Sequence, residues 1–372
     1  MVNLNIIKEK YKLETNPFYQ AGGDLIDRKN IRKELYQKIK ILTGSTSTQM
    51  LFLNGPYGIG KTMLLQQIDE DIKNKKIEEL KEDNVLSVYL RIMQSPHPPN
   101  YVVYIHNQIF RNLGLTFFQD ILKQYNAINK NADTLSKIDT NFLNAFTKLD
   151  TEPTHAWNYL IGEALSAAVM KELDVASGVY SAEEASRDLI SLLRVLNLLN
   201  YHTLILFVDE VDNLFTLVGK KKVAEVLVSL RDIYDLINNE INSDKNITQL
   251  IFILSGTNNT RKDILDLSSE LPAIAAFSGR VILGEFQIPG FLDEDTEELI
   301  RAKLNTVRTA STDLHPFTKE YIEFITKNTR GNPRDILNRT AFILDEASDQ
   351  DLSVINGTDA EKILNKLNLS LP

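Results

Sequence analysis

Eight consecutive residues of this chain have the types and spacing of a phosphate-binding loop. The segment Gly55-Pro56-Tyr57-Gly58-Ile59-Gly60-Lys61-Thr62 matches G-x-x-x-x-G-K-[ST] at every fixed position. Its glycines can take backbone angles closed to other residues, so successive N–H groups can point at phosphate oxygens. The lysine can reach the β- and γ-phosphates, and the threonine hydroxyl can ligate Mg²⁺. We therefore expect ATP and Mg²⁺ as cofactors, contacted by Gly55, Pro56, Tyr57, Gly58, Ile59, Gly60, Lys61, Thr62 and Met63.

Two acidic residues follow the apolar run 204–208 and suit the chemistry of a bound phosphate. Asp209 is placed to hold Mg²⁺ through its water shell, together with Thr62, and Glu210 is placed to polarise an attacking water. A buried strand that ends in Asp-Glu is the Walker B arrangement. Asp212 completes the sequence Asp-Glu-Val-Asp and could equally cap a helix.

A second polar cluster, Ser255-Gly256-Thr257-Asn258, follows the apolar run 250–254. A side chain at this position could hydrogen-bond the attacking water. Thr257 and Asn258 are the favoured candidates, but Gly256 makes the turn ambiguous and the sequence does not choose between them. A plain turn is the alternative.

The elements that must position these residues are short apolar strands alternating with helices. Residues 50–54, 85–90, 204–208 and 250–254 read as strands, and residues 281–283 as the start of a fifth. Short apolar runs of this kind are typical of parallel strands covered on both faces. The pattern predicts an α/β fold with a five-stranded parallel P-loop sheet flanked by helices.

Helical patterns dominate two other regions. Residues 101–200 read as almost wholly helical, with a capping box at Ser181 to Glu184 and a helix over 157–173. We interpret residues 116–186 as a helical insertion, because they exceed what a strand-helix-strand unit requires. Residues 1–290 are expected to form the nucleotide-binding domain and residues 291–372 a small all-helical lid. Helices are also expected over 26–41 and 63–79.

Composition excludes several classes of function. The 372 residues contain no cysteine, which rules out disulfides, thiolate zinc sites and cysteine nucleophiles. The five histidines are scattered, with no pair at the spacing of a metal site. No apolar run reaches the roughly 18 residues that a membrane span needs. We expect a cytoplasmic protein with no membrane partner, and the net charge of −9 disfavours DNA binding by the surface as a whole.

These motifs in this order resemble the AAA+ ATPases, nearest the branch of origin-recognition and replication-initiator ATPases and the TnsC and TniB transposition regulators. Asn16-Pro17-Phe18 followed by Asp27-Arg28-Lys29 looks like the N-terminal box of that branch, which passes near the adenine. Asp209-Glu210-Val211-Asp212-Asn213-Leu214 looks like its Walker B form. The resemblance implies that Arg28 contacts nucleotide.

The same resemblance implies functional roles for Arg334 and Arg280. Gly331-Asn332-Pro333-Arg334 resembles the sensor 2 motif, which implies that Arg334 acts on the γ-phosphate. Ser278-Gly279-Arg280 stands where the family often places an arginine finger for the neighbouring subunit's ATP, although Arg280 could instead act in cis or be structural.

The resemblance implies an ATPase that assembles with copies of itself and acts as a switch or loader for partner proteins. A DNA-related process such as replication, transposition, or mobile-element or anti-phage defence is expected. Lys220-Lys221-Lys222 could face DNA, but a solvated turn is the simpler interpretation. The alternative function is a STAND-type signalling or scaffold ATPase that acts through proteins without DNA. A nucleotide kinase is disfavoured by the Gly-Asn-Pro-Arg motif.

Overall fold

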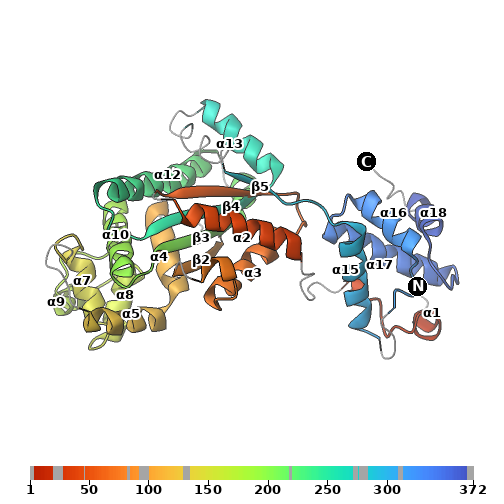
Figure 1. Ribbon diagram of the computed structural model, residues 1–372, viewed down its shortest axis with the longest axis horizontal. Coiled ribbons are helices and arrows are strands. Elements are labelled where there is room, and N and C mark those ends of the chain that lie inside the picture. The colour runs from red at the N-terminus through yellow and green to blue at the C-terminus, as the bar shows by residue number, and fades with distance from the viewer. Residues whose placement is uncertain are drawn as a thin grey trace. The chain divides into compact units, whose positions relative to one another are not determined.

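The chain folds into two compact units. The structure is a computed structural model that describes residues 4–19, 28–45, 47–81, 84–91, 100–128, 135–217, 220–270, 275, 284–308 and 313–366. The sheet unit contains Arg32–Asn54 and Leu64–Phe286, and the C-terminal unit contains Met1–Ile31, Gly55–Met63 and Gln287–Pro372 (Figure 1). The division at residue 290 made from the sequence stays a prediction.

A five-stranded sheet has the order β2-β3-β4-β1-β5. The pairs β2/β3, β3/β4 and β4/β1 are parallel, which confirms the predicted fold class. The expected start of a fifth strand at 281–283 lies outside the described residues, and β5 is described from Glu285. The strands are β1 (Gln49–Asn54), β2 (Val85–Arg91), β3 (Thr203–Asp209), β4 (Gln249–Gly256) and β5 (Glu285–Gln287).

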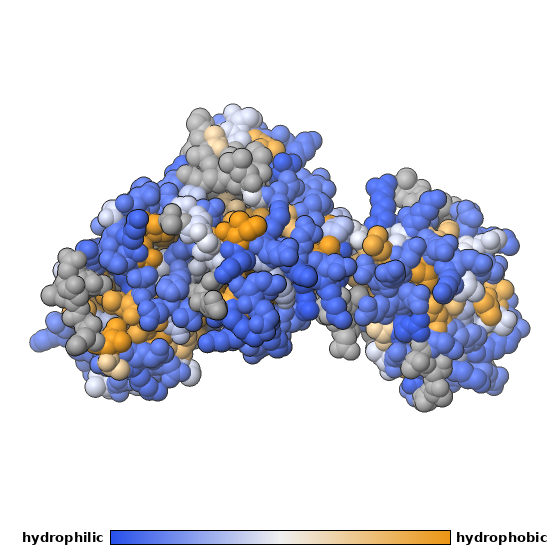
Figure 2. Space-filling model, in the orientation of Figure 1, coloured by the Kyte–Doolittle hydropathy of each residue, from blue (hydrophilic) through white to orange (hydrophobic). Residues whose placement is uncertain are grey.

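The central strands are apolar throughout because both of their faces are covered. Every residue of β3 and β4 is buried. Leu204, Leu206 and Val208 join a core that includes residues of helices α4, α10 and α12, while the intervening Ile205 and Phe207 are equally buried on the opposite face. Helices accordingly surround the sheet (Figure 1). Figure 2 shows mostly hydrophilic residues on the face in view.

The connection from β2 to β3 is helical, as predicted, but the helix expected over 157–173 is wrong. That stretch forms two helices separated at Gly162, whose φ of 69° favours glycine. A side chain there would also collide with the Asn107 side chain. The predicted capping box between Ser181 and Glu184 is present. The helices are α4 (Tyr101–Leu113), α5 (Leu115–Ala127), α7 (Thr140–Thr147), α8 (Pro153–Leu160), α9 (Ala167–Leu173) and α10 (Ala182–Leu198).

Five further helices accompany the strands in the chain. The helix predicted over 63–79 is shorter than expected, because it ends at Lys73 and Lys75 has a left-handed φ of 52°. A separate 3-10 turn, η2, follows. The elements are α2 (Lys29–Thr43), α3 (Lys61–Lys73), η2 (Glu78–Leu80), α11 (Val211–Leu217), α12 (Lys220–Ser243) and α13 (Asn258–Glu270).

The C-terminal unit is a helical unit with its own apolar core, which the N-terminal segment helps to build. Ile7, Tyr11 and Phe18 are buried with residues of the C-terminal helices. No helix in the described ranges is long and apolar enough to span a membrane. The elements of this unit are α1 (Leu4–Glu9), η1 (Pro17–Tyr19), α15 (Asp293–Asn305), α16 (Lys319–Thr329), α17 (Pro333–Asp349) and α18 (Gly357–Lys366).

A buried carboxyl group lies in the core of the sheet unit. The Asp188 side chain of α10 is 3.4 Å from the Tyr159 hydroxyl and 3.8 Å from Nε2 of His106 on α4. Burial, reinforced by the carboxylate of Asp139, raises the pKa of Asp188 well above its ordinary value. Burial also lowers the pKa of His106 to about 4. Burial therefore favours the neutral form of both groups in the folded protein.

We expect Asp188→Asn to be more stable than the wild type, by a margin that grows as the pH rises above about 4, where the carboxyl group of the unfolded chain loses its proton. The folded chain keeps the Asp188 proton to a higher pH than the unfolded chain, so unfolding releases a proton and stability falls as pH rises. The amide of the Asp188→Asn variant has no such proton, so its free energy of unfolding does not fall with pH for this reason. The fall that it avoids is at most about 1.4 kcal/mol per pH unit. Urea unfolding followed by the fluorescence of Trp157, the single tryptophan, measures the difference. A margin that does not change with pH would show that Asp188 is ionised in the fold.

Candidate functional site

The carboxylate of Asp209 ends β3 in a buried position with every oxygen hydrogen-bonded. The Ser255 hydroxyl and the Glu210 N–H, at 2.9 Å, donate to Oδ1, and the Tyr89 hydroxyl donates to Oδ2 at 2.6 Å. Burial and this bond to Asp209 raise the pKa of Tyr89, which keeps the phenol a donor. A carboxylate that is oriented by hydroxyl donors suits a hydrated Mg²⁺, which prefers carboxylate oxygens and keeps several waters.

Strand register explains these partners. Val208 pairs with Leu254, so the next residue of β3 comes beside Ser255 of β4. On the other side, Arg91 of β2 pairs with Asp209. Because the strands are parallel, they present their last residues at one edge of the sheet. Tyr89 and Arg91 were not predicted as site residues, although Tyr89 lies near the end of the predicted strand 85–90 and Arg91 directly follows it.

Glu210 has a strained backbone and a carboxylate held from two sides. Its φ is 60°, a left-handed conformation that costs a non-glycine residue about 1–3 kcal/mol. The Arg91 Nη2 atom lies 2.9 Å from Oε1, and the Asn213 amide donates to Oε2 at 2.9 Å. The Glu210 carboxylate is thus directed toward the end of β2, where it forms an ion pair with Arg91.

The two residues that the sequence favoured for binding the attacking water lie at the start of α13. The Asp212 Oδ1 atom accepts from the Thr257 N–H at 2.8 Å and the Thr260 hydroxyl at 2.5 Å. The Thr257 and Thr260 hydroxyls lie 3.0 Å apart. The Asn258 side chain accepts from Asn54, the last residue of β1. Thr257 and Asp212 therefore help to cap α13, and the proposed contacts of Thr257 and Asn258 with water stay predictions.

The phosphate loop has the backbone that its glycines predict. Gly58 and Gly60 have φ angles of 84° and 98°. Lys61 begins α3 and is largely buried, and its Nζ donates to the carbonyl oxygens of Gly55 at 2.8 Å and Pro56 at 3.2 Å. The lysine thus lies across the loop at the start of a helix, where N–H groups and dipole favour phosphate. This set of groups fits a nucleotide phosphate.

The other residues of the loop divide into packed and exposed ones. Ile59 is buried, and a Cβ on Gly55 would meet its side chain at 2.9 Å, so this glycine allows close packing. Thr62 is half-buried as the second residue of α3, and Met63 is exposed. Thr62 stands where the motif needs a metal ligand.

Within the C-terminal unit, the loop is joined to the start of α17. The Asn332 side chain caps this helix by accepting from the Arg334 N–H at 3.1 Å, and its amide donates to the Tyr57 carbonyl at 2.7 Å. The Arg334 guanidinium lies 4.3 Å from the centre of the Tyr57 ring, a cation–π contact. Pro333 is the first residue of α17, a position that suits proline because the N–H it lacks has no partner within the helix there. Arg334 is thus beside the loop, while its action on a γ-phosphate stays a prediction.

The remaining predicted residues have other surroundings. The Arg28 guanidinium donates to the Pro289 carbonyl and lies 4.9 Å from the Phe291 ring centre, and burial lowers its pKa. Its contact with nucleotide stays a prediction. Arg280 lies outside the described residues. Lys220 forms an exposed ion pair with Glu270.

No protein-family model and no curated protein matches this chain. Solved structures similar to it include the Aeropyrum pernix ORC2 protein (ADPNP–ADP complexes), with 14% identity, a TM-score of 0.48, and 94% of this chain and 71% of that chain covered. The Drosophila ORC bound to DNA has 13% identity and a TM-score of 0.48, with 98% of this chain and 67% of that chain covered. Cdc6p from Pyrobaculum aerophilum has 12% identity and a TM-score of 0.43, with 94% of this chain and 70% of that chain covered. The resemblance to transposition regulators stays a prediction. At these identities the activity must be argued from the chain's own residues.

We expect Ser255→Ala to lower the free energy of unfolding by about 1.5–3 kcal/mol, the usual value of a hydrogen bond to a charged group. The substitution removes one donor from a buried carboxylate. Urea unfolding followed by Trp157 fluorescence measures the change. Ser229→Ala is the matched control, because that exposed hydroxyl bonds only to the Glu225 carbonyl of its own helix in the described structure. Equal stabilities of the two variants would contradict the role of Ser255.

Proposed function

We propose that this chain binds ATP and hydrolyses it to ADP and phosphate. The observation that carries the proposal is the pair Asp209 and Glu210 at the end of a fully buried strand. The buried carboxylate is fixed by donors, and its neighbour is more exposed and stands at the carboxyl edge of the sheet. A phosphate loop that begins directly after β1 in the chain supplies the complementary binding group.

In the proposed reaction, Lys61 and the loop N–H groups bind the β- and γ-phosphates. Thr62 and Asp209 would hold Mg²⁺, which when bound would neutralise phosphate charge. Glu210 orients a water and accepts its proton as the water oxygen bonds to the γ-phosphorus. The bond from that phosphorus to the bridging oxygen breaks, and ADP leaves with the electron pair.

We further propose that hydrolysis drives a switch or loader that assembles with copies of itself and acts on protein partners. Arg334 supports this proposal, because it lies beside Tyr57 of the loop and belongs to the helical C-terminal unit. Because the Arg334 guanidinium belongs to α17 and contacts the loop, phosphate binding at the loop can change the position of this helix. Arg280 is proposed to stabilise transition-state charge, in cis or in a neighbouring copy.

A cytoplasmic, DNA-related process is the setting that we propose from the motifs. The net charge of −9 means that any contact with DNA would need a local basic surface. Binding to a DNA duplex that needs ATP and weakens steeply with salt would support this setting. An ATP-dependent complex that forms equally well without DNA would instead favour a signalling or scaffold ATPase.

Substitutions of Lys61 and Glu210 should separate binding from turnover. Lys61→Ala is expected to weaken ATP binding by about 10- to 150-fold, the equivalent of one charge-assisted bond of about 1.5–3 kcal/mol. Glu210→Gln should keep ATP binding and lower turnover by about 100-fold or more, because a general base contributes about that factor. Calorimetry with ATP and a phosphate-release assay measure the two effects.

Lys75→Ala and Glu163→Gln serve as controls, since both side chains are exposed and lie outside the proposed machinery. Both control variants should bind and hydrolyse ATP as the wild type does. Normal turnover by the Glu210→Gln protein would refute the assignment of the base.

We expect Arg91→Ala to raise ATP turnover by up to about fivefold. The Arg91 guanidinium occupies one oxygen of Glu210, and its removal frees that oxygen to bind the attacking water. The fivefold limit corresponds to about 1 kcal/mol, the largest stabilisation usually measured for a partly exposed ion pair. Arg111→Ala, which breaks the exposed pair with Glu163, is the matched control in the same phosphate-release assay. A tenfold fall in turnover would show that Arg91 instead holds Glu210 in its working position.

A further inference from the structure

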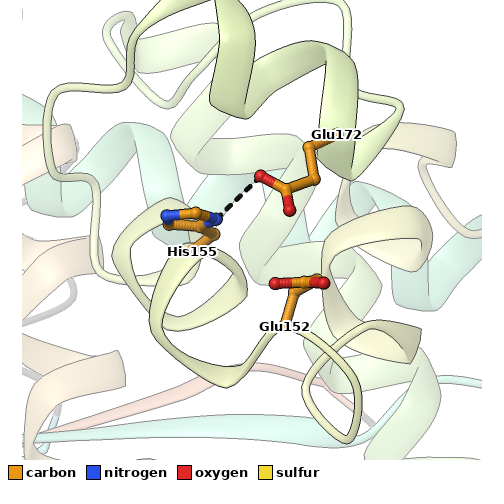
Figure 3. Close-up of side chains that lie close together, drawn as sticks. All are labelled: Glu152, His155 and Glu172. Atoms are coloured by element: carbon orange, nitrogen blue, oxygen red, sulfur yellow. Dashed lines mark ion pairs between the residues drawn. The ribbon is translucent and has the colours of Figure 1, made fainter.

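Helices α8 and α9 bring together three side chains of metal-ligating type, far from the proposed ATPase motifs in the chain. Glu152, His155 and Glu172 each offer one ligand atom, and these atoms all lie within 4.8 Å of one another. Figure 3 shows the imidazole and both carboxylates directed toward one space. We call this group the EHE cluster.

The local fold fixes the backbone of the cluster. Glu152 directly precedes α8, and His155 lies one turn later, so both side chains are on one side of the helix start. Fully buried Ala156 anchors this turn, and fully buried Leu173 anchors the end of α9. The Lys148 ammonium also donates to the Glu172 carbonyl. The cluster is therefore held by two packed helices.

The polar atoms of the EHE cluster are poorly satisfied by the chain. The Nδ1 atom of His155 is shielded from solvent and makes no hydrogen bond with any described residue, although it lies 2.9 Å from Oε2 of Glu172. The Glu152 side chain does not cap α8, and within the described ranges its carboxylate has no hydrogen-bond or ion-pair partner. Two carboxylates this close repel each other unless a cation is shared between them. The His155–Glu172 contact alone leaves Glu152 unexplained.

We propose that the EHE cluster binds a divalent transition-metal ion of the Zn²⁺ type. One imidazole nitrogen and two carboxylate oxygens form a three-ligand set, and water supplies the fourth position. A nitrogen ligand favours Zn²⁺ over Mg²⁺, which prefers oxygen ligands. Bonds of about 2.1 Å in a tetrahedral site put ligand atoms about 3.4 Å apart. The separations, none larger than 4.8 Å, therefore need to shrink by at most about 1.4 Å, a distance that rotation of an exposed carboxylate can supply.

The bound ion joins the first turn of α8 to the last turn of α9, across the connection that begins after Leu160. These helices belong to the stretch 116–186 that the sequence analysis interprets as an insertion. The ion thereby stiffens this stretch against unfolding. The inference does not depend on ATP hydrolysis, because the cluster shares no residue with the proposed site.

Zinc titration of the full untagged chain tests the proposal. The buffer has a pH of about 7.5, since metal ligands must be deprotonated, and contains excess Mg²⁺ to occupy sites with oxygen ligands only. We expect one Zn²⁺ per chain by competition with a chromophoric chelator. His155→Ala and Glu172→Gln should each weaken binding by at least about tenfold. Co²⁺ should give the visible absorption of a tetrahedral site in the wild type and not in His155→Ala.

Two matched controls separate this site from general surface binding. His202→Ala removes an exposed histidine elsewhere, and Glu163→Gln removes an exposed carboxylate of the same helical stretch. Both should bind Zn²⁺ as the wild type does, and circular dichroism confirms that all variants fold. The proposal is overturned by Zn²⁺ binding that His155→Ala leaves unchanged, or by a wild-type dissociation constant weaker than about 100 µM.

Discussion

The parallel register of β2, β3, β4 and β1 is the constraint on which the chemistry of this chain depends. Pairing of Val208 with Leu254 and of Arg91 with Asp209 brings the last residues of separate strands to one edge of the sheet. A shift of one residue in a strand would turn each side chain to the opposite face. The buried apolar side chains on both faces of β3 and β4 fix the register, so the hydrophobic core determines the position of the carboxylates.

Burial of a carboxylate is tolerated here because the same register supplies its donors. An unpaired buried charge is costly, but Asp209 accepts hydrogen bonds from Tyr89, Ser255 and its own neighbour's N–H. Glu210 differs from Asp209 because its backbone is strained and its carboxylate is partly exposed. Adjacent acidic residues thus receive different environments. One is immobilised, and the other keeps access to solvent.

The position of each motif at the end of a strand could be predicted from the sequence, because the residues of a motif lie next to one another along the chain. Residues 55–62 and the pair Asp209 and Glu210 could be placed at strand ends from hydrophobic runs alone. Their partners from other strands could not be found in this way. Ser255 was passed over in favour of Thr257 and Asn258, because only the register shows which residue after Leu254 comes beside Asp209.

Local periodicity failed for a similar reason at the helix expected over 157–173. The apolar spacing continues through Gly162, but the helix ends at Leu160, Gly162 has a positive φ, and a side chain at Gly162 would collide with Asn107. That contact joins residues 55 positions apart in the sequence, so no window of neighbouring residues could contain it. The break has a chemical consequence. It turns the chain back, so that α9 brings Glu172 to His155 on α8. A continuous helix would have placed these two side chains about 25 Å apart, at 1.5 Å per residue. The EHE cluster therefore depends on a helix break that the local apolar pattern does not predict.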